Sequence, residues 1–264
     1  QNRFNAMKEN VSNLAHETVF EVRNVTSRDR KKVRDISFSV CRGEILGFAG
    51  LVGSGRTELM NCLFGVDKRA GGEIRLNGKD ISPRSPLDAV KKGMAYITES
   101  RRDNGFFPNF SIAQNMAISR SLKDGGYKGA MGLFHEVDEQ RTAEAQRELL
   151  ALKCHSVNQN ITELSGGNQQ KVLISKWLCC RPEVIIFDEP TRGIDVGAKA
   201  EIYKVMRQLA DDGKVILMVS SELPEIITVC DRIAVFCEGR LTQILTNRDD
   251  MSEEEIMAWA LPQE

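Results

Sequence analysis

The sequence predicts an α/β protein whose parallel β-sheet is covered by helices on both faces. Short apolar runs rich in β-branched residues, which are typical of buried strands, occupy residues 44–49, 184–188, 215–220 and 233–237. Helical patterns lie between these runs, at residues 58–64, 169–178 and 198–210. Strands and helices that alternate along a chain build parallel sheets, because each helix returns the chain to the edge where the previous strand began. With 264 residues, 41% of them hydrophobic, the chain can bury a large core without disulfides or structural metals.

Three stretches follow other patterns. Residues 19–40 alternate between apolar runs and short turns, which predicts an antiparallel β region. Residues 112–153 show helical periodicity without a convincing strand, so we expect an inserted α-helical subdomain within about residues 100–168. Residues 237–241 predict a hairpin turn.

Both termini are expected to lie outside this core. Residues 1–17 are polar and weakly patterned, which favours an interdomain linker ahead of a domain at 18–264; a processed N-terminus is the alternative. In a C-terminal tail at about 246–264, Ser252 is expected to cap a short last helix, with Glu255 at the capping-box position.

Composition excludes several classes of protein. Lys and Arg number 36 against 37 Asp and Glu, so the chain lacks the basic excess of a nucleic-acid binder, and no nucleic-acid partner is expected. The seven cysteines are odd in number and form no C-x-x-C pair, which favours reduced thiols over disulfides or a zinc site. No signal peptide or membrane-spanning stretch is visible, so we expect a cytoplasmic domain that acts on membranes through partner subunits.

A glycine-rich loop follows the first predicted parallel strand. Its residues are Gly50, Leu51, Val52, Gly53, Ser54, Gly55, Arg56 and Thr57, and Glu58 follows in the predicted helix. Glycine allows positive φ angles, so successive N–H groups can turn inward to bind an anion, and the helix N-terminus directs its dipole to the same place. The hydroxyl of Thr57 would then ligate Mg²⁺. Taken alone, the loop is also compatible with an ordinary glycine-rich turn between a strand and a helix.

Arg56 departs from the usual phosphate loop, which has lysine at this position. Lysine is a compact point charge, whereas arginine is a larger planar fork. The positive charge is kept and its geometry is changed. We therefore expect nucleotide binding to be retained and catalysis to be impaired.

Two carboxylates end the predicted strand at 184–188. Asp188 could hold Mg²⁺ through water, and Glu189 could polarise the attacking water as the catalytic base. Two adjacent acids more often cap a helix. Their place after a buried strand, downstream of a phosphate loop, favours the metal site.

A second glycine turn leads into the helical pattern at 169–178. It contains Leu164, Ser165, Gly166, Gly167 and Gln169. A Ser-Gly-Gly turn before a helix is another anion-binding helix start, and one chain rarely needs two of them on the same nucleotide. We therefore expect this turn to face the γ-phosphate of a nucleotide bound by another domain, although a simple serine N-cap is the plainer interpretation.

In this order, the motifs resemble those of ABC transporter nucleotide-binding domains. Gly50–Thr57 resembles the Walker A loop, Leu164–Gln169 the signature, and Val184–Glu189 the Walker B strand; Asp195 lies at the position of the D-loop. The resemblance extends from about Val19 to about Leu245 and implies a P-loop NTPase fold. That fold has a RecA-like parallel sheet, an antiparallel β subdomain and an inserted α-helical subdomain.

Within that family, the chain is most similar to the C-terminal halves of duplicated monosaccharide importer ATPases of the ribose and allose type. The resemblance implies ATP and Mg²⁺ as cofactors and import of a monosaccharide, D-allose, across the inner membrane. It also implies a peripheral location on the cytoplasmic face of that membrane. The implied partners are an N-terminal ABC half of the same polypeptide, transmembrane permease subunits and, indirectly, a periplasmic sugar-binding protein.

Four positions close to the implied site differ from the family pattern. Arg56 replaces the lysine, Ser221 stands at the position of the switch histidine, and Glu99 replaces the loop glutamine, where it could ligate Mg²⁺ but also repel phosphate. No aromatic residue for stacking on adenine lies at 26–31, where Arg28 is the substitute. Losing one proton-transfer or positioning group slows a reaction by about 10²–10⁴. We therefore expect weak or absent hydrolysis by this domain, with its signature completing a partner's ATP site in trans.

Two other functions are compatible with the motifs. A non-hydrolysing, ATP-gated structural clamp is favoured by the altered positions but not by Glu189. A soluble ABC protein acting on DNA or ribosomes is disfavoured, because the chain lacks long coiled-coil insertions and strongly charged linkers. By resemblance, the surface at 101–108 would contact the permease through Phe106 and Phe107, unless both rings pack into the helical subdomain.

Overall fold

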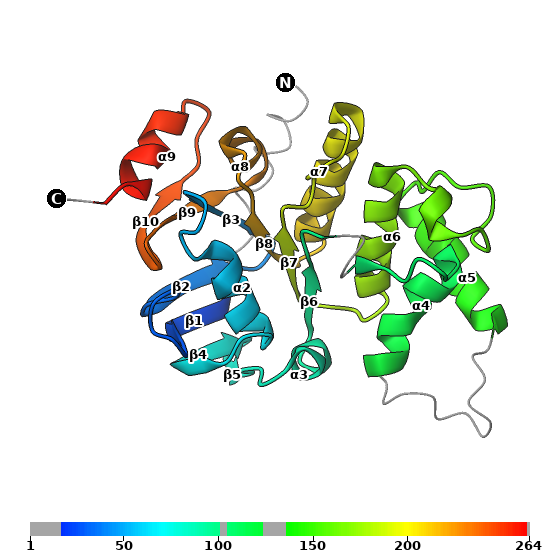
Figure 1. Ribbon diagram of the computed structural model, residues 1–264, viewed down its shortest axis with the longest axis horizontal. Coiled ribbons are helices and arrows are strands. Elements are labelled where there is room, and N and C mark those ends of the chain that lie inside the picture. The colour runs from blue at the N-terminus through cyan, green and yellow to red at the C-terminus, as the bar shows by residue number, and fades with distance from the viewer. Residues whose placement is uncertain (1–16, 101–104, 124–135, 263–264) are drawn as a thin grey trace.

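The computed structural model describes residues 17–100, 105–123 and 136–262 (Figure 1). Its strands are β1 (Thr18–Ser27), β2 (Ile36–Cys41), β3 (Ile45–Gly50), β4 (Arg69–Leu76), β5 (Lys79–Asp80), β6 (Met94–Ile97), β7 (Val184–Asp188), β8 (Val215–Val219), β9 (Arg232–Cys237) and β10 (Arg240–Thr246). Its helices are α2 (Arg56–Phe64), α3 (Pro86–Lys91), α4 (Ile112–Lys123), α5 (Glu136–Leu149), η3 (Ile161–Glu163), α6 (Gly166–Leu178), α7 (Val196–Asp211), α8 (Leu223–Val229) and α9 (Glu253–Ala260).

The central layer is a six-stranded sheet in the order β10-β9-β3-β8-β7-β6. β9, β3, β8, β7 and β6 run parallel, and β10 pairs antiparallel with β9 across the predicted hairpin. The predicted parallel sheet is therefore confirmed, and all four predicted strands lie within it. The sequence did not identify β6 and β10, which extend the sheet at its two edges.

Alternate residues of the central strands enter two different apolar clusters. In β3, Leu46 and Phe48 pack on one face while Ile45 and Ala49 pack on the other. The first cluster fills the space toward the antiparallel sheet, and the second packs beneath α7, α8 and α9. This two-residue period explains why each central strand is a continuous apolar run.

The predicted antiparallel β region is a four-stranded sheet in the order β2-β1-β4-β5. β1 pairs with both β2 and β4, and Phe20 of β1 is completely buried. The sequence missed β4, whose first half contains Gly71 and Gly72 and has no apolar alternation.

The predicted helical subdomain is formed by α4, α5 and α6, which lie to the right in Figure 1 and enclose a third apolar cluster. In the described part of this subdomain, the one strand-like feature is an isolated bridge between Ser111 and Asn160. The observed helices α2 and α6 begin two or three residues before the predicted ones, at Arg56 and Gly166.

The C-terminal helix shows one correction. Ser252 caps α9 as predicted, because its Oγ accepts a hydrogen bond from Glu255 N at 3.2 Å. The Glu255 carboxylate does not complete a capping box: it accepts from the Arg248 guanidinium at 3.0 and 2.5 Å. A charged fork nearby is a stronger partner for a carboxylate than a backbone N–H.

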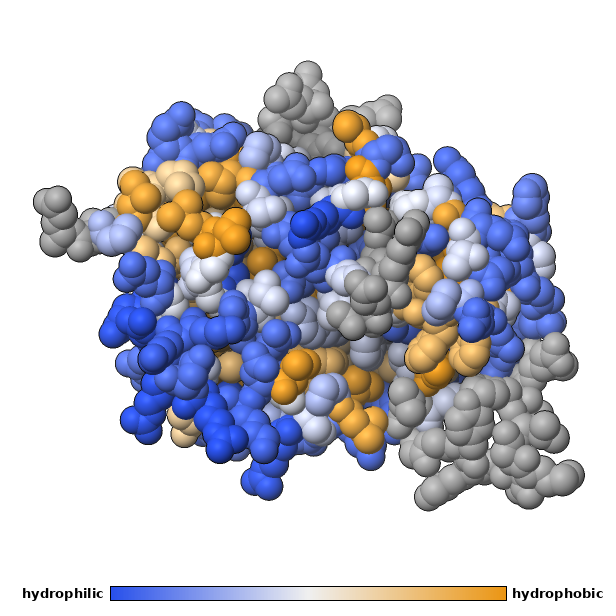
Figure 2. Space-filling view, viewed as in Figure 1, coloured by the Kyte–Doolittle hydropathy of each residue, from blue (hydrophilic) through white to orange (hydrophobic). Residues whose placement is uncertain are grey.

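The surface over α9 and β10 is partly apolar. Figure 2 shows hydrophobic residues gathered there. Among the residues of these elements, Leu261 at the end of α9 is 49% exposed, and Leu241 and Ile244 of β10 are half-buried. Within the described ranges, none of the helices is both long and apolar enough to cross a bilayer.

Candidate functional site

The glycine loop lies between the carboxyl end of β3 and the start of α2. Gly53 and Gly55 have φ angles of 79° and 104°, in the left-handed region that glycine adopts without strain. A Cβ atom at Gly55 would lie 2.2 Å from the carbonyl oxygen of Lys32, so only glycine fits against that strand connection. A Cβ atom at Gly53 would meet nothing within 4 Å, so the loop is open on this side.

Two features of the loop suit a phosphate. Ser54 is only 6% exposed, and its Oγ has no hydrogen-bond partner among the described residues. A buried hydroxyl without a partner is costly, and an anionic ligand in the loop would satisfy it. Leu51 and Val52, at the tip of the loop, are 45% and 93% exposed and leave its mouth uncovered.

Thr57 and Asp188 meet beneath this loop. The Thr57 hydroxyl donates to Asp188 Oδ1 at 3.2 Å, and the Tyr96 hydroxyl donates to Asp188 Oδ2 at 2.9 Å. Burial raises the pKa of Asp188, while these two hydrogen bonds and the nearby Arg56 charge act in the opposite direction. A hydroxyl and a carboxylate oxygen are the ligands that Mg²⁺ prefers. The pair that the sequence predicted for the metal is therefore brought together.

Tyr96 is a site residue that sequence reasoning missed. It lies in β6, opposite Ile186 of β7, and burial beside Asp188 raises its pKa. The one available signal was the apolar run 94–97, which is short for a strand. The hydroxyl keeps the Asp188 carboxylate oriented from the side opposite Thr57.

Glu189 and Ser221 are also neighbours. The Ser221 hydroxyl donates to Glu189 Oε2 at 3.2 Å, across the adjacent ends of β7 and β8. Glu189 has a φ of 49°, which turns the chain sharply just after the strand. Partial burial raises the pKa of the Glu189 carboxyl, against the opposing effects of Ser221 and Arg56.

The Arg56 side chain is turned inward. It is 7% exposed, and its NH1 donates to the carbonyl oxygen of Ser220 at 2.7 Å. Burial lowers the pKa of the guanidinium, while Glu189 and Asp188 raise it. The guanidinium is therefore held to the end of β8, close to both acids.

Glu58 and Glu99 are paired with cations in the structure. Glu58 lies 3.3 Å from Lys32, and Glu99 forms an ion pair with Arg192. Among the described residues, no hydrogen bond or ion pair joins Glu99 to Thr57 or Asp188. The Arg192 guanidinium is thus the neighbour of Glu99 in this structure, and the role of Glu99 as a metal ligand stays a prediction.

The predicted signature residues divide into surface and structural groups. Ser165 is exposed at the start of α6, and its Oγ accepts from Asn168 Nδ2 at 2.9 Å; Gly166 is half-buried. Gly167 is buried against α7, where an added Cβ would lie 2.6 Å from Ala198 Cβ.

The other two signature side chains point into the helical subdomain. Leu164 packs in its apolar cluster, and Gln169, 7% exposed, donates to the carbonyl oxygen of Ile161 at 3.3 Å. Of the predicted set, Ser165 and Gly166 therefore remain accessible. The others hold the turn in place.

Three further predicted residues have clear positions. Asp195 caps α7, with its side chain accepting from Ala198 N at 3.0 Å, and Val196 beside it is 85% exposed. The Phe106 ring is buried in the helical subdomain, whereas Phe107 is 47% exposed and stacks on Phe110. Phe106 therefore packs into the subdomain, whereas Phe107 is exposed and its contact with a permease stays a prediction.

Two further predictions concern the permease contact and the residue that stacks on adenine. Residues 101–104 of the predicted permease contact lie outside the described residues. Arg28, the substitute for an adenine-stacking aromatic residue, is exposed, and its backbone N–H donates to Lys68 O at 3.0 Å.

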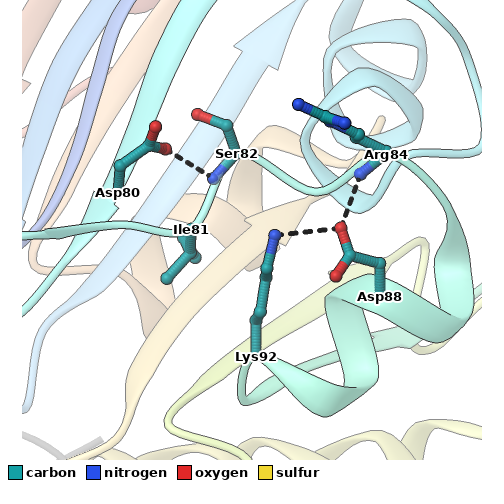
Figure 3. Close-up of a pocket in the computed structure, with 6 residues that line it drawn as sticks. All are labelled: Asp80, Ile81, Ser82, Arg84, Asp88 and Lys92. Atoms are coloured by element: carbon teal, nitrogen blue, oxygen red, sulfur yellow. Dashed lines mark hydrogen bonds and ion pairs between the residues drawn. The ribbon is translucent and has the colours of Figure 1, made fainter.

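A separate pocket of about 450 Å³ lies beside α3 and β5 (Figure 3). Its carboxylates are already bonded to neighbours: Asp80 accepts from Ser82 N, and Asp88 accepts from Arg84 N and Lys92 Nζ, each at 2.9 Å. None of the glycine-loop residues lines it. The glycine loop, with the residues at the ends of β7 and β8, is therefore the better candidate site.

Together, these contacts place an anion-binding loop, a hydroxyl–carboxylate pair and a second carboxylate at the carboxyl ends of parallel strands. Ligands of open α/β sheets bind at this edge. The arrangement can hold a polyphosphate with a divalent cation beside a candidate general base.

Several known proteins are similar in sequence. The chain is 99% identical over 264 residues to the D-allose import ATP-binding protein AlsA of Escherichia coli K12, and it covers 52% of that protein. It is 45% identical over 246 residues to the ribose import ATP-binding protein RbsA of Bacillus cereus, covering 92% of this chain and 48% of that protein. The chain thus spans about half the length of these curated relatives.

Solved structures and a family model agree with the fold. A nucleotide-free ATP-binding cassette from an ABC transporter superposes with a TM-score of 0.76 at 20% identity, covering 94% of this chain and 100% of that chain. A cassette in its ADP conformation gives a TM-score of 0.73 at 23% identity, covering 91% and 94%. The ABC transporter family model matches residues 33–192, which is more than half of the sequence. The chain therefore belongs to the ABC transporter family.

Proposed function

We propose that this chain binds Mg²⁺-ATP in the loop 50–57 and acts as the ATP-binding part of a monosaccharide importer. The observation that carries the proposal is the hydrogen bond between Thr57 and Asp188 directly beneath an open glycine loop. Backbone N–H groups of the loop and the orphaned Ser54 hydroxyl would hold phosphate, and Thr57 and Asp188 would hold Mg²⁺. The metal would neutralise phosphate charge.

The sugar and the partners are proposed from the relatives. Their names specify import of D-allose, ribose and galactose or methyl galactoside, and the D-allose protein is 99% identical. We assign D-allose, with transmembrane permease subunits as direct partners, a periplasmic sugar-binding protein as an indirect one, and a position on the cytoplasmic face of the inner membrane. We also propose that the chain is one half of a duplicated ATPase, because it covers 52% of the D-allose protein and 48% of the ribose protein. The resemblance of its motifs favours the second half.

Within such an assembly, this site would hydrolyse ATP slowly. Arg56 is bonded to Ser220 O, Ser221 replaces an imidazole beside Glu189, and Glu99 is paired with Arg192. The exposed Ser165 would instead complete the ATP site of a partner ABC domain.

A non-hydrolysing clamp is the second candidate. It is favoured by the inward position of Arg56, which keeps the guanidinium on a backbone carbonyl. Turnover that depends on Glu189 would distinguish the importer ATPase from this clamp.

The proposal is tested by titrating the chain with ATP in Mg²⁺ and in EDTA. Thr57→Ala removes the hydroxyl beside Asp188 and should weaken Mg²⁺-ATP binding about tenfold or more, since bonds to charged groups contribute about 1.5–3 kcal/mol. Thr57→Ser keeps a hydroxyl and is the matched control, expected to bind as the wild type does. An absence of saturable Mg²⁺-ATP binding by the wild type would contradict the proposal.

A further inference from the structure

A buried carboxylate outside the predicted site collects four side-chain donors. Glu225, on α8, is 5% exposed. Its Oε1 accepts from Thr191 Oγ1 at 2.5 Å, Lys199 Nζ at 2.8 Å and Tyr203 OH at 2.7 Å, and its Oε2 accepts from Ser220 Oγ at 2.9 Å.

These donors keep the carboxylate ionised. Burial alone would raise the pKa of Glu225, but hydrogen bonds from Lys199, Thr191, Tyr203 and Ser220 lower it below its usual value. An anion buried with several oriented donors fixes the groups that surround it, because each donor would otherwise be left unsatisfied. Glu225 is therefore a rigid junction between the segments that supply its donors.

Two of those segments form the candidate site. Thr191 follows Glu189 by two residues in the turn after β7. Ser220 contributes its carbonyl oxygen to Arg56, and the next residue, Ser221, donates to Glu189. One carboxylate therefore bonds Thr191, two residues after the acid, and the side chain of Ser220, whose backbone carbonyl receives the loop arginine.

The third segment is α7. Lys199 and Tyr203 lie in the first half of this helix, which begins after the Asp195 cap and the exposed Val196. A displacement of α7 would thus be passed to the ends of β7 and β8 through Glu225.

We propose that Glu225 is a positioning residue of the nucleotide site, which holds the 220–221 segment in register with Arg56 and Glu189 and couples both to α7. This inference rests on the proposed ATP-binding function. It specifies that recognition of the γ-phosphate, rather than of the nucleotide as a whole, depends on Glu225, because the 220–221 segment also positions Glu189, the candidate base beside the γ-phosphate that ADP lacks.

The chain offers a matched control. Glu222 also binds Lys199, at 2.8 and 2.9 Å, but its side chain is 56% exposed. Among the described residues, its carboxylate hydrogen-bonds neither Thr191 nor Ser220. Glu222→Gln therefore removes one negative charge beside Lys199 and leaves the Glu225 carboxylate and its four donors in place.

The experiment measures affinities for Mg²⁺-ATP and Mg²⁺-ADP by calorimetry in the wild type, Glu225→Gln and Glu222→Gln. Glu225→Gln should weaken ATP binding about five- to tenfold and ADP binding less than about twofold, as expected for one misplaced charged contact. Glu222→Gln should leave both affinities unchanged. A purely structural role would lower the melting temperature and weaken ATP and ADP binding equally.

Amide hydrogen exchange without nucleotide provides an independent reading. Glu225→Gln should accelerate exchange at both 189–194 and 220–222, and Glu222→Gln at neither. If Glu225→Gln does not fold, Ser220→Ala removes the link to Oε2 together with the hydrogen bond that Ser220 Oγ accepts from Glu222 N at 3.0 Å. It should also lower the ratio of ATP to ADP affinity, by a smaller factor.

The outcomes separate the two proposals. The positioning role would be overturned if Glu225→Gln left ATP and ADP binding unchanged or weakened both equally. It would also be overturned if the accelerated amide exchange were confined to α8. In either case the ATP-binding function would stand. A wild type that binds neither nucleotide would overturn the proposed function itself.

Discussion

Arg56 shows how one substitution redirects a site. Its guanidinium extends to Ser220 O. A lysine at this position would instead place a compact point charge in the loop. Ser221 keeps a hydrogen bond to Glu189 but has no ring nitrogen to position or transfer a proton. We therefore expect the chain alone to turn ATP over slowly. The combined variant Arg56→Lys, Glu99→Gln, Ser221→His should raise its steady-state phosphate release by at least about tenfold, a fraction of the 10²–10⁴ that one such group contributes.

The control for this gain is Glu189→Gln in the combined variant. If Glu189 is the general base, this change returns phosphate release to the background while ATP binding persists. Rapid turnover by the unmodified chain, or a combined variant no faster than the wild type, would refute the impaired-site hypothesis.

The sequence could predict which backbone positions meet at the site, but not all the side-chain contacts. Thr57, Asp188 and Glu189 were predicted to converge, since parallel strands place their carboxyl ends at one edge. The contacts of Tyr96 with Asp188 and of Arg56 with Ser220 O join residues 92 and 164 positions apart. They depend on strand order and on side-chain rotamers, which no local pattern contains.

At the scale of elements, the packing of α6 against α7 depends on one glycine. A Cβ atom at Gly167 would lie 2.6 Å from Ala198 Cβ, far inside van der Waals contact. Gly167→Ala should therefore push the two helices apart and lower the free energy of unfolding by about 1–3 kcal/mol, the usual effect of overpacking. Urea denaturation measures this change.

Gly197→Ala is the matched control on the facing helix. Its Cβ would lie 3.4 Å from Asp195 Oδ1, an ordinary contact, and alanine favours helix by up to about 1 kcal/mol. Stability should stay the same or rise slightly. Equal destabilisation by the two variants would show that the contact with Ala198 does not account for the effect of Gly167→Ala.

Glycine also explains where the predicted helices differ from the observed ones. α6 begins at Gly166, within a Gly-Gly pair of low helix propensity, so the periodic pattern becomes visible only at Gln169.

β6 has four residues, too few for a period to show, and it is a strand because β7 pairs with it. Tertiary pairing, not local propensity, therefore makes residues 94–97 a strand.

On the scale of the whole molecule, α6 connects the three apolar clusters. Val172 and Leu173 pack in the helical subdomain, Ile174 packs in the cluster beneath α7, and Trp177 contacts the clusters on both faces of the central sheet. The core of each part of the fold therefore includes a residue of this helix. A substitution that destabilises α6 should therefore lower the free energy of global unfolding rather than open one part of the fold locally.

Lys176 of α6 allows the contribution of this helix to stability to be measured. It is 7% exposed, its Nζ donates to Gly105 O at 2.5 Å and lies 5.1 Å from the centre of the Trp177 ring. Burial lowers the pKa of this ammonium from 10.5 to about 8, against a smaller raising effect of Cys180. A shift of this size, at about 1.4 kcal/mol per unit, corresponds to a folded-state penalty on the order of 3 kcal/mol when the group is charged.

The sign of the pH dependence follows from the lowered pKa. Below about pH 8 both folded and unfolded chains carry the proton; between about 8 and 10.5 the folded chain has lost it while the unfolded chain keeps it. Stability rises with pH wherever the unfolded state binds more protons, so the destabilisation caused by this buried charge is progressively relieved across that window. Lys176→Met has no proton to lose, and Lys176→Arg stays charged throughout, so both should lack this contribution. Urea denaturation between pH 7 and 10.5 should show a steeper rise for the wild type than for either variant, and parallel curves for all three would contradict the buried charge.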